Sequence, residues 1–337
     1  MAAYTTIDNP ELYFQTKLYS GDGSTDVSHT FDGSEDMQAN MVWFKRLNGS
    51  ANHFLYDSVR GANRSLVPND TDAEATSGEQ TTYLASFDSD GFTLGDDVNN
   101  INASSETYVA WAWKESATAG FDIVSYTGNA TARTISHSLS AVPDWILCKR
   151  LSNTADWTTS TTGVNWENSF FLNQTNAAGD APTTWNDTDP TSSVFTLGTT
   201  SLVNADGDNF IAYLWSNIQG FSKIGKYIGN GNSNGPFVYT GFRPAFIMFK
   251  PAGESADWTI CDTKRNTFNP IDGDSTLNAN LASAEHDGGM DFDIVSNGFK
   301  VRNANTDNNS SNSAGIIYIA FAEQPFANSN GVPANAR

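Results

Sequence analysis

The stretch YVAWAW at residues 108–113 decides the fold, because it returns twice further along the chain. Its counterparts are FIAYLW at 210–215 and YIAFA at 318–322. All three runs are apolar at odd and even positions alike, which is typical of a central strand covered on both faces. The small residue that they share is Ala110, Ala212 and Ala320. A residue that stays small among large ones predicts a closely packed neighbour at that point.

Three further landmarks precede each apolar run in the same order. The first is a turn motif, YSGD at 19–22, YTGN at 126–129 and YIGN at 227–230. The second is a strand core, MVWFKR at 41–46, WILCKR at 145–150 and FIMFKP at 246–251. The third is GFTLG at 91–95, VFTLG at 194–198 and GFKV at 298–301. The period is about 105 residues, longer than a solenoid unit, so the pattern indicates duplication of a whole domain.

Between the landmarks, short stretches alternate apolar and polar residues and are bounded by Gly, Asn and Asp, as β-strands are. Helical periodicity is almost absent, apart from a cap-then-proline signal at 8–11. We therefore predict an all-β fold of three tandem antiparallel β-sandwich repeats. The predicted division is an N-terminal docking arm at 1–15, repeats at 16–115, 116–220 and 221–325, and a C-terminal tail at 326–337.

The charge balance excludes two classes of partner. The chain has 18 basic and 38 acidic residues, a net charge of −20. Nucleic-acid binding needs clustered Lys and Arg, and adsorption to anionic membranes needs positive charge too. The longest apolar run, 314–322, is also short of the ~20 residues of a membrane-spanning helix. We expect no nucleic-acid partner and no membrane insertion.

Titratable residues do not follow the repeat in the way that a catalytic set would. No Glu recurs at a landmark in all three copies, and most Asp residues stand beside Gly, Asn, Ser or Thr, as turn formers do. His29, His137 and Tyr239 occupy matched positions by sequence, which favours packing over proton transfer. We expect no enzyme and no catalytic residues. A carboxylate pair for glycoside hydrolysis remains the alternative, because such pairs meet in space and not in sequence.

Metal sites and cofactors are not indicated. Cys148 and Cys261 stand at non-equivalent positions, so no disulfide is expected, and four scattered His add no zinc site. The acidic loops at 88–91 and 272–274 lack the spacing of an EF-hand. We expect no cofactor and no metal ligands, with an incidental Ca²⁺ in these loops as the alternative.

Aromatic residues outside the repeated positions are the candidate glycan contacts, because an exposed ring offers an apolar face to a sugar. They are Trp157, Trp166, Trp185 and Trp258. The alternative is that these rings pack one repeat against the next.

The two flanks carry the candidate assembly anchor. Apolar side chains on a free arm need a partner, since burying one large side chain gains ~1.5–3 kcal/mol. The predicted anchor residues are Tyr4, Leu12, Tyr13, Phe14 and Phe326.

Several motifs resemble repeated domains in virion structural proteins of marine and freshwater tailed bacteriophages. They are IDNP at 7–10, YTGN at 126–129, PDWI at 143–146, FTLG at 195–198 and GVPANAR at 331–337. The resemblance covers essentially the whole chain. It implies an external tail or capsid appendage, a fibre or decoration, that acts in particle assembly and stability, with host-surface attachment as an additional role.

The same resemblance implies partners among other virion proteins, a homo-oligomer in the particle, and a virion location after assembly in the bacterial cytoplasm. The rival hypothesis is a carbohydrate-binding module or a depolymerase that acts on host surface glycan.

Overall fold

The computed structural model describes residues 3–76, 78, 82–96, 100–267, 269, 275–287, 289 and 291–335. About 40% of the chain is strand and 5% is helix, and the pairings between the named strands are antiparallel. The predicted all-β class is confirmed.

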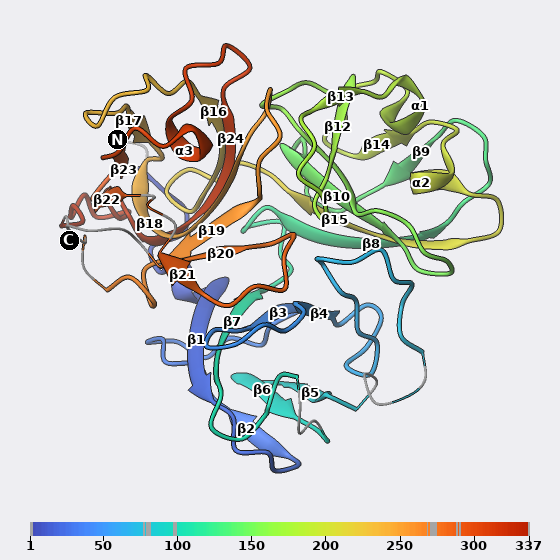
Figure 1. The fold of residues 1–337 in the computed structure, drawn as a ribbon, viewed down its shortest axis with the longest axis horizontal. Helices are drawn as coiled ribbons and strands as arrows, with labels where there is room; N and C mark the ends of the chain where they lie inside the picture. Colours follow the sequence, from blue (N-terminus) through green and yellow to red (C-terminus); the bar gives the residue numbers. More distant parts are fainter. Residues whose placement is uncertain are drawn as a thin grey trace.

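Three large sheets, each from one third of the chain, form the framework (Figure 1). The first has the order β1 (Phe14–Ser20), β7 (Thr107–Trp113), β3 (Met41–Arg46), β4 (Phe54–Asp57). The second is β8 (Phe121–Thr127), β15 (Asn209–Trp215), β10 (Trp145–Arg150), β11 (Thr158–Thr161), β12 (Asn168–Phe171), β13 (Gly179–Asp180). The third is β16 (Ser222–Tyr227), β24 (Ile316–Pro325), β18 (Phe242–Pro251), β19 (Thr259–Asp262), β20 (Ser275–Asn278), β21 (His286–Asp287). Residues 14–113, 121–215 and 222–325 are called the first, second and third segments below.

Each segment adds one small sheet. These are β2 (Val27–His29), β6 (Gly91–Leu94) and β5 (Leu84–Asp88); β9 (Arg133–Ser136) and β14 (Val194–Leu197); and β17 (Phe237–Tyr239), β23 (Gly298–Val301) and β22 (Phe292–Val295). Short helical turns are η1 (Pro10–Leu12), α1 (Pro182–Trp185), α2 (Ser201–Asn204) and α3 (Thr306–Asn309). The η1 turn begins at Asn9, whose side chain accepts from the Glu11 N–H, as the cap-then-proline signal predicts.

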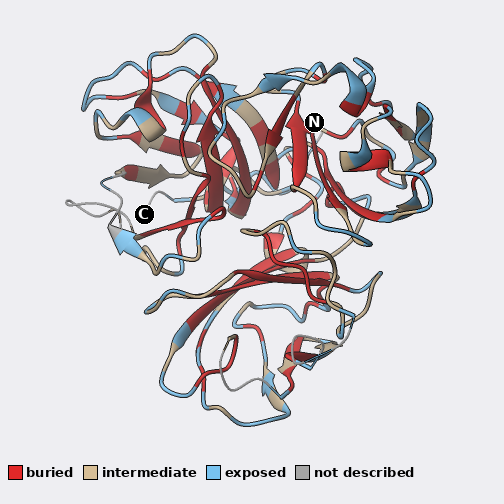
Figure 2. Cartoon of the chain, turned by 45° about the vertical axis from the view of Figure 1, so that its right-hand side comes forward, coloured by how far each residue is buried: buried red, intermediate tan, exposed pale blue. Residues whose placement is uncertain are grey.

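Alternate residues of each central strand face two different cores. On β7, Trp111 and Trp113 belong to a central cluster to which all three segments contribute. Ala110 and Ala112 face a cluster of the first segment alone. Successive strand residues point to opposite faces, so a strand between two cores must be apolar at both parities. Figure 2 shows these strands as buried bands where the large sheets meet.

The strand register changes one of the sequence equivalences. Ala110, Ala212 and Tyr318 lie opposite matched residues of the neighbouring strand, namely Phe44, Cys148 and Phe249. Ala320 lies two residues further on, opposite Ile247. Matching Ala320 with Ala110 and Ala212 is therefore wrong, because the apolar run of the third segment begins earlier, at Ile316.

The repeated turn motif is held by a buried asparagine that the sequence comparison did not single out. In the second segment, Asn204 Oδ1 accepts from the Asn129 N–H at 3.0 Å. Its Nδ2 donates to Thr131 O at 2.8 Å and to Gly198 O at 2.7 Å. Asn102 and Asn309 hold the other two turns in the same way.

The Tyr and the Gly that recur in this turn motif each have a structural reason. Tyr126 Oη donates to Val203 O at 2.8 Å, next to the buried asparagine. A Cβ placed on Gly128 would come within 2.1 Å of Ala205 O, so the turn accepts only glycine. The motif therefore records a close approach of two backbone segments.

Both ends of the chain lie against the third segment. Tyr4 Oη donates to Gly241 O at 2.9 Å, and its ring meets Phe326 edge-on at 6.0 Å. Phe14 enters the central cluster and stacks on Phe321 at 5.2 Å. Tyr13 packs on Phe221, which directly precedes β16.

The anchor residues are predicted to pack against another subunit, and these contacts give four of the five partners within the chain. Tyr4, Tyr13, Phe14 and Phe326 already pack within the chain, and Leu12 is half-buried in η1. These side chains therefore do not need another subunit to cover them. Their partners lie in or next to the third segment, because both chain ends lie against its large sheet.

Candidate functional site

Three buried lysines occupy the same register position on β3, β10 and β18. Lys149 Nζ donates to Ala155 O in its own segment at 2.5 Å and to Thr71 O in the first segment at 2.8 Å. Lys45 and Lys250 repeat this arrangement and reach the third and second segments, respectively, at Ala282 O and Thr175 O. Each lysine joins its segment to a different neighbour, so the three contacts close a ring.

Burial lowers the pKa of each of these three amines to about 8. A lowered lysine pKa is a feature of reactive amines at active sites. Here the three residues are 0% exposed, and each Nζ donates to backbone carbonyls. No substrate can reach them, so their role is to join the segments.

We expect Lys149→Met to lower the free energy of unfolding by about 1–3 kcal/mol, because Ala155 O loses the donor that satisfies it inside the fold. Chemical denaturation monitored by Trp fluorescence measures the change. Lys226→Met, at an exposed position, is the matched control and should leave stability nearly unchanged. Equal stability of the two variants would show that the ring of contacts does not stabilise the fold.

A second set of equivalent residues also crosses between segments. Trp157 Nε1 donates to Val67 O and Trp258 Nε1 to Phe171 O, both at 2.9 Å. His53 takes this place in the first segment, with Nε2 3.0 Å from Asn278 O. These rings pack one segment against the next.

The hydrogen bonds of His53 define its tautomer. Its Nδ1 accepts from Trp43 Nε1 at 2.8 Å, so Nε2 carries the proton and donates to the carbonyl. Burial lowers the pKa of His53 well below its usual value. The ring is therefore neutral near pH 7.

Trp166 and Trp185 lie inside the second segment and meet edge to face at 5.9 Å. Trp185 Nε1 donates to Ser169 Oγ. With Trp157 and Trp258, these residues are at most 3% exposed. The prediction of glycan contacts at these four positions is therefore wrong, because the rings fill space within and between segments.

Two of the three junctions contain a buried ion pair. Arg60 Nε lies 2.5 Å from Asp57 Oδ2, and Arg60 Nη1 lies 3.2 Å from Glu74 Oε1. Tyr213 of the second segment donates to the same Asp57 oxygen at 2.6 Å. The third segment repeats the arrangement with Asp262, Arg265, Glu285 and Trp111. The second segment has Thr161 and Val164 at these positions.

A pair of carboxyl groups lies at the connection between the first and second segments. Glu115 Oε1 accepts from the Ile123 N–H at 3.3 Å, and Asp122 Oδ1 accepts from it at 3.1 Å. Asp122 is 4% exposed. Burial, together with Asp122 and the more distant Asp57, raises the pKa of Glu115 to about 7.

Stability should therefore depend on pH through Glu115. Its raised pKa means that the folded chain binds more protons than the unfolded chain between the usual value of 4.5 and about 7. The free energy of unfolding then falls as pH rises through that window. Melting temperatures of the native chain and of Glu115→Gln across pH 4–8 test this. The variant should lose this part of the slope, and an unchanged slope would assign it to other groups.

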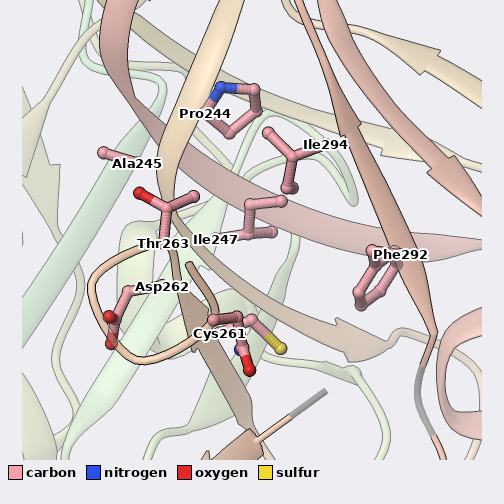
Figure 3. Close-up of a pocket in the computed structure, with 9 residues that line it drawn as sticks. Pro244, Ala245, Ile247, Cys261, Asp262, Thr263, Phe292 and Ile294 are labelled. Carbon is pink, nitrogen blue, oxygen red and sulfur yellow. The ribbon is translucent and has the colours of Figure 1, made fainter. Parts of the chain in front are cut away.

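The cavity in Figure 3 is too small for a substrate. Its volume is about 20 Å³, room for about one water. Cys261, Phe292 and Ile294 line it together with residues of β18. Cys261 and Cys148 are both buried, and no disulfide joins them.

Two larger hollows lie where segments meet. One of about 190 Å³ lies between the first and third segments and includes Glu11, Lys264 and Glu323. Its carboxylates are engaged, since Glu11 accepts from Ser34 and Glu323 pairs with Arg243. The other, of about 560 Å³, is an open groove between the first and second segments.

Within the described part of the chain, no three His, Cys, Asp or Glu side chains gather as metal ligands would, and no helix is long and apolar enough to cross a membrane. In the loop at 88–91, Asp88 accepts from the hydroxyls of Ser86 and Thr93. The loop at 272–274 lies outside the described residues.

The histidine match also changes. On the paired strands, His29, Ile135 and Val238 lie opposite the equivalent Phe of each segment. His29 packs on Tyr19 at 4.4 Å, which supports the interpretation of packing. Matching His29 with Tyr239 is wrong by one residue and matching it with His137 is wrong by two, since short strands of similar composition align almost equally well in several registers.

Two exposed aromatic side chains were missed by the sequence analysis. Phe237 and Tyr239 on β17 are 48% and 52% exposed. The signal was present in the sequence, because a spacing of two residues puts both side chains on one face of a strand. What the sequence could not show is that this face turns to solvent.

Residues 9–325 match the family model described as Domain of unknown function (DUF7483). No curated protein and no solved structure gives a match. The matched region runs from the cap of η1 to the end of β24 and so includes all three segments, and the chain belongs to this DUF7483 family.

Proposed function

We propose that this chain is three tandem copies of one β-sandwich unit and serves as a structural protein on the outside of a bacteriophage particle, on the tail or on the capsid. The observation that carries this proposal is the ring of lysine contacts, Lys45, Lys149 and Lys250. It uses buried charge to bind three segments into one body, and rigidity is what a fibre or decoration protein needs.

The proposal of three copies is supported by matched contacts as well as by matched strands. The turn asparagines, the lysines and the Trp157–Trp258–His53 set each recur once per segment. Random similarity among short strands would not reproduce hydrogen bonds to the same backbone positions.

The external position rests on charge. A net charge of −20 favours a protein that faces water over one that contacts packaged nucleic acid. The proposed partners are other virion proteins and further copies of this chain. The proposed role is particle assembly and stability, without enzymatic activity, after synthesis in the bacterial cytoplasm.

The experiment is to purify particles of the phage that encodes the chain and to locate it in a cryo-EM map. We expect density for the three-segment body on the outer surface of the tail or head. Its absence from purified particles, with the chain free in the lysate, would refute the virion role.

The rival hypothesis is a depolymerase, and the purified chain tests it. Incubation of the purified chain with surface polysaccharide should leave the viscosity unchanged. A fall in viscosity that tracks the protein through purification would replace the structural role with an enzymatic one.

A further inference from the structure

We propose that the outer face of β17 is a binding site for a neutral sugar ring, formed by Phe237 and Tyr239. This inference does not depend on the virion role, because it concerns a surface of the folded chain itself.

The two side chains project from the same face of an edge strand, because they are two residues apart. β17 is the outermost strand of the sheet β17-β23-β22, and Tyr239 lies opposite Gly298 while Phe237 lies opposite Lys300. A Cβ on Gly298 would come within 3.1 Å of Phe237 Cε2, so the Phe237 ring extends over the glycine. Because glycine has no side chain, the Phe237 ring can lie against the neighbouring strand at this point, with one of its faces still exposed.

The Tyr239 ring is held in place without being covered. Its hydroxyl lies 2.9 Å from Tyr4 Oη, which itself donates to Gly241 O at 2.9 Å. Phe326 supports the Tyr4 ring from the side. Figure 1 shows the N-terminus beside β17. A ring fixed before binding loses little conformational entropy when the ligand stacks on it.

Only the third segment has aromatic side chains at these positions. The strand register places Ser28 and Thr134 at the position of Phe237, and Ser136 at the position of Tyr239. The same sheet therefore forms with hydroxyl side chains in the other segments. Strand pairing therefore does not require the two aromatic rings, whose exposed faces can contact a ligand.

The size of the surface selects the kind of ligand. An aromatic side chain buries 150–250 Å² when covered, so two half-exposed rings offer roughly 200 Å². A stable protein interface needs about 800 Å² from each partner. The C–H face of one or two sugar rings matches the smaller area. The net charge of −20 disfavours acidic polysaccharides, which leaves neutral hexoses and N-acetylhexosamines.

The test replaces both rings with the residues that the second segment carries, Phe237→Thr with Tyr239→Ser. The probe is an immobilised array of oligosaccharides of neutral hexoses and N-acetylhexosamines. We expect the native chain to bind a subset of the array and the double variant to bind it at least tenfold more weakly, with the same melting temperature. Tyr4→Phe removes only the hydroxyl that holds Tyr239 and should cause a smaller loss.

The matched control is Ser28→Ala with Thr134→Ala, at the equivalent strand position in the other two segments, which should bind as the native chain does. The proposal is overturned if the native chain binds nothing on the array, or if the double variant binds equally well. Particle incorporation of the double variant is measured separately, so loss of sugar binding with normal incorporation would leave the virion role intact.

Discussion

We expect Asp57→Thr to lower the free energy of unfolding by about 3–5 kcal/mol, because it leaves Arg60 as a buried cation without its closest partner. Asp57 is 0% exposed and accepts from both Arg60 and Tyr213. One substitution therefore removes an ion pair within the first segment and a hydrogen bond from the second segment to the first. Chemical denaturation followed by circular dichroism measures the loss.

The second segment shows which residues can replace this ion pair. The second segment keeps the same strand with Thr161 and Val164 in place of the ion pair. We therefore expect Asp57→Thr with Arg60→Val and Tyr213→Phe to recover most of the lost stability, since an apolar replacement of a buried pair is often close to neutral and Glu74 keeps its contact with Arg64. If the triple variant is as unstable as Asp57→Thr alone, loss of charge pairing is not the cause.

Ala212→Trp should destabilise the chain by about 3 kcal/mol or more, at or beyond the usual range for overpacking of a core. Ala212 is 0% exposed and lies between Cys148 and Val124 in the middle of the second large sheet. The added ring points into a buried cluster that includes Phe195 and Leu197 of the small sheet, so it must displace them. Thermal unfolding measures the effect.

The control for this variant is Ser125→Trp, an exposed position on the adjacent strand β8, which should change stability little. The third segment allows the opposite substitution, from a large residue to a small one, because Tyr318 lies where the other segments have Ala. Tyr318→Ala should also destabilise, by about 2–5 kcal/mol, through the cavity that it leaves. A melting curve of Ala212→Trp equal to that of the native chain would place this position at an exposed edge.

Much of the fold could be predicted from the sequence because the information is local. Period-two alternation marks the strands, and apolar residues at both parities in 108–113 and 210–215 mark strands with two covered faces. The turn motif could be found too, since Gly128 and its counterparts are required by a close backbone contact within one segment.

The site predictions fared differently. Trp157 and Trp258 looked like surface candidates because they fall outside the repeated strand cores, yet both are buried between segments. Phe237 and Tyr239 looked like part of a strand and are the exposed rings. A sequence pattern gives the spacing of side chains along a strand, and it does not say which face another segment covers.

The sequence by itself determined the all-β class and the strand positions, because these depend on residues that are close together in the chain. It also determined the threefold recurrence of landmarks, because that is found by comparing one part of the sequence with another. The tertiary structure alone decided that Lys45, Lys149 and Lys250 form a ring, that the chain ends fold back onto the third segment, and that the aromatic face of β17 stays open. These outcomes depend on contacts between residues far apart in the chain, such as Lys45 with Ala282, which are 237 positions apart. Burial is a property of the packed whole, so no stretch of sequence carries it alone.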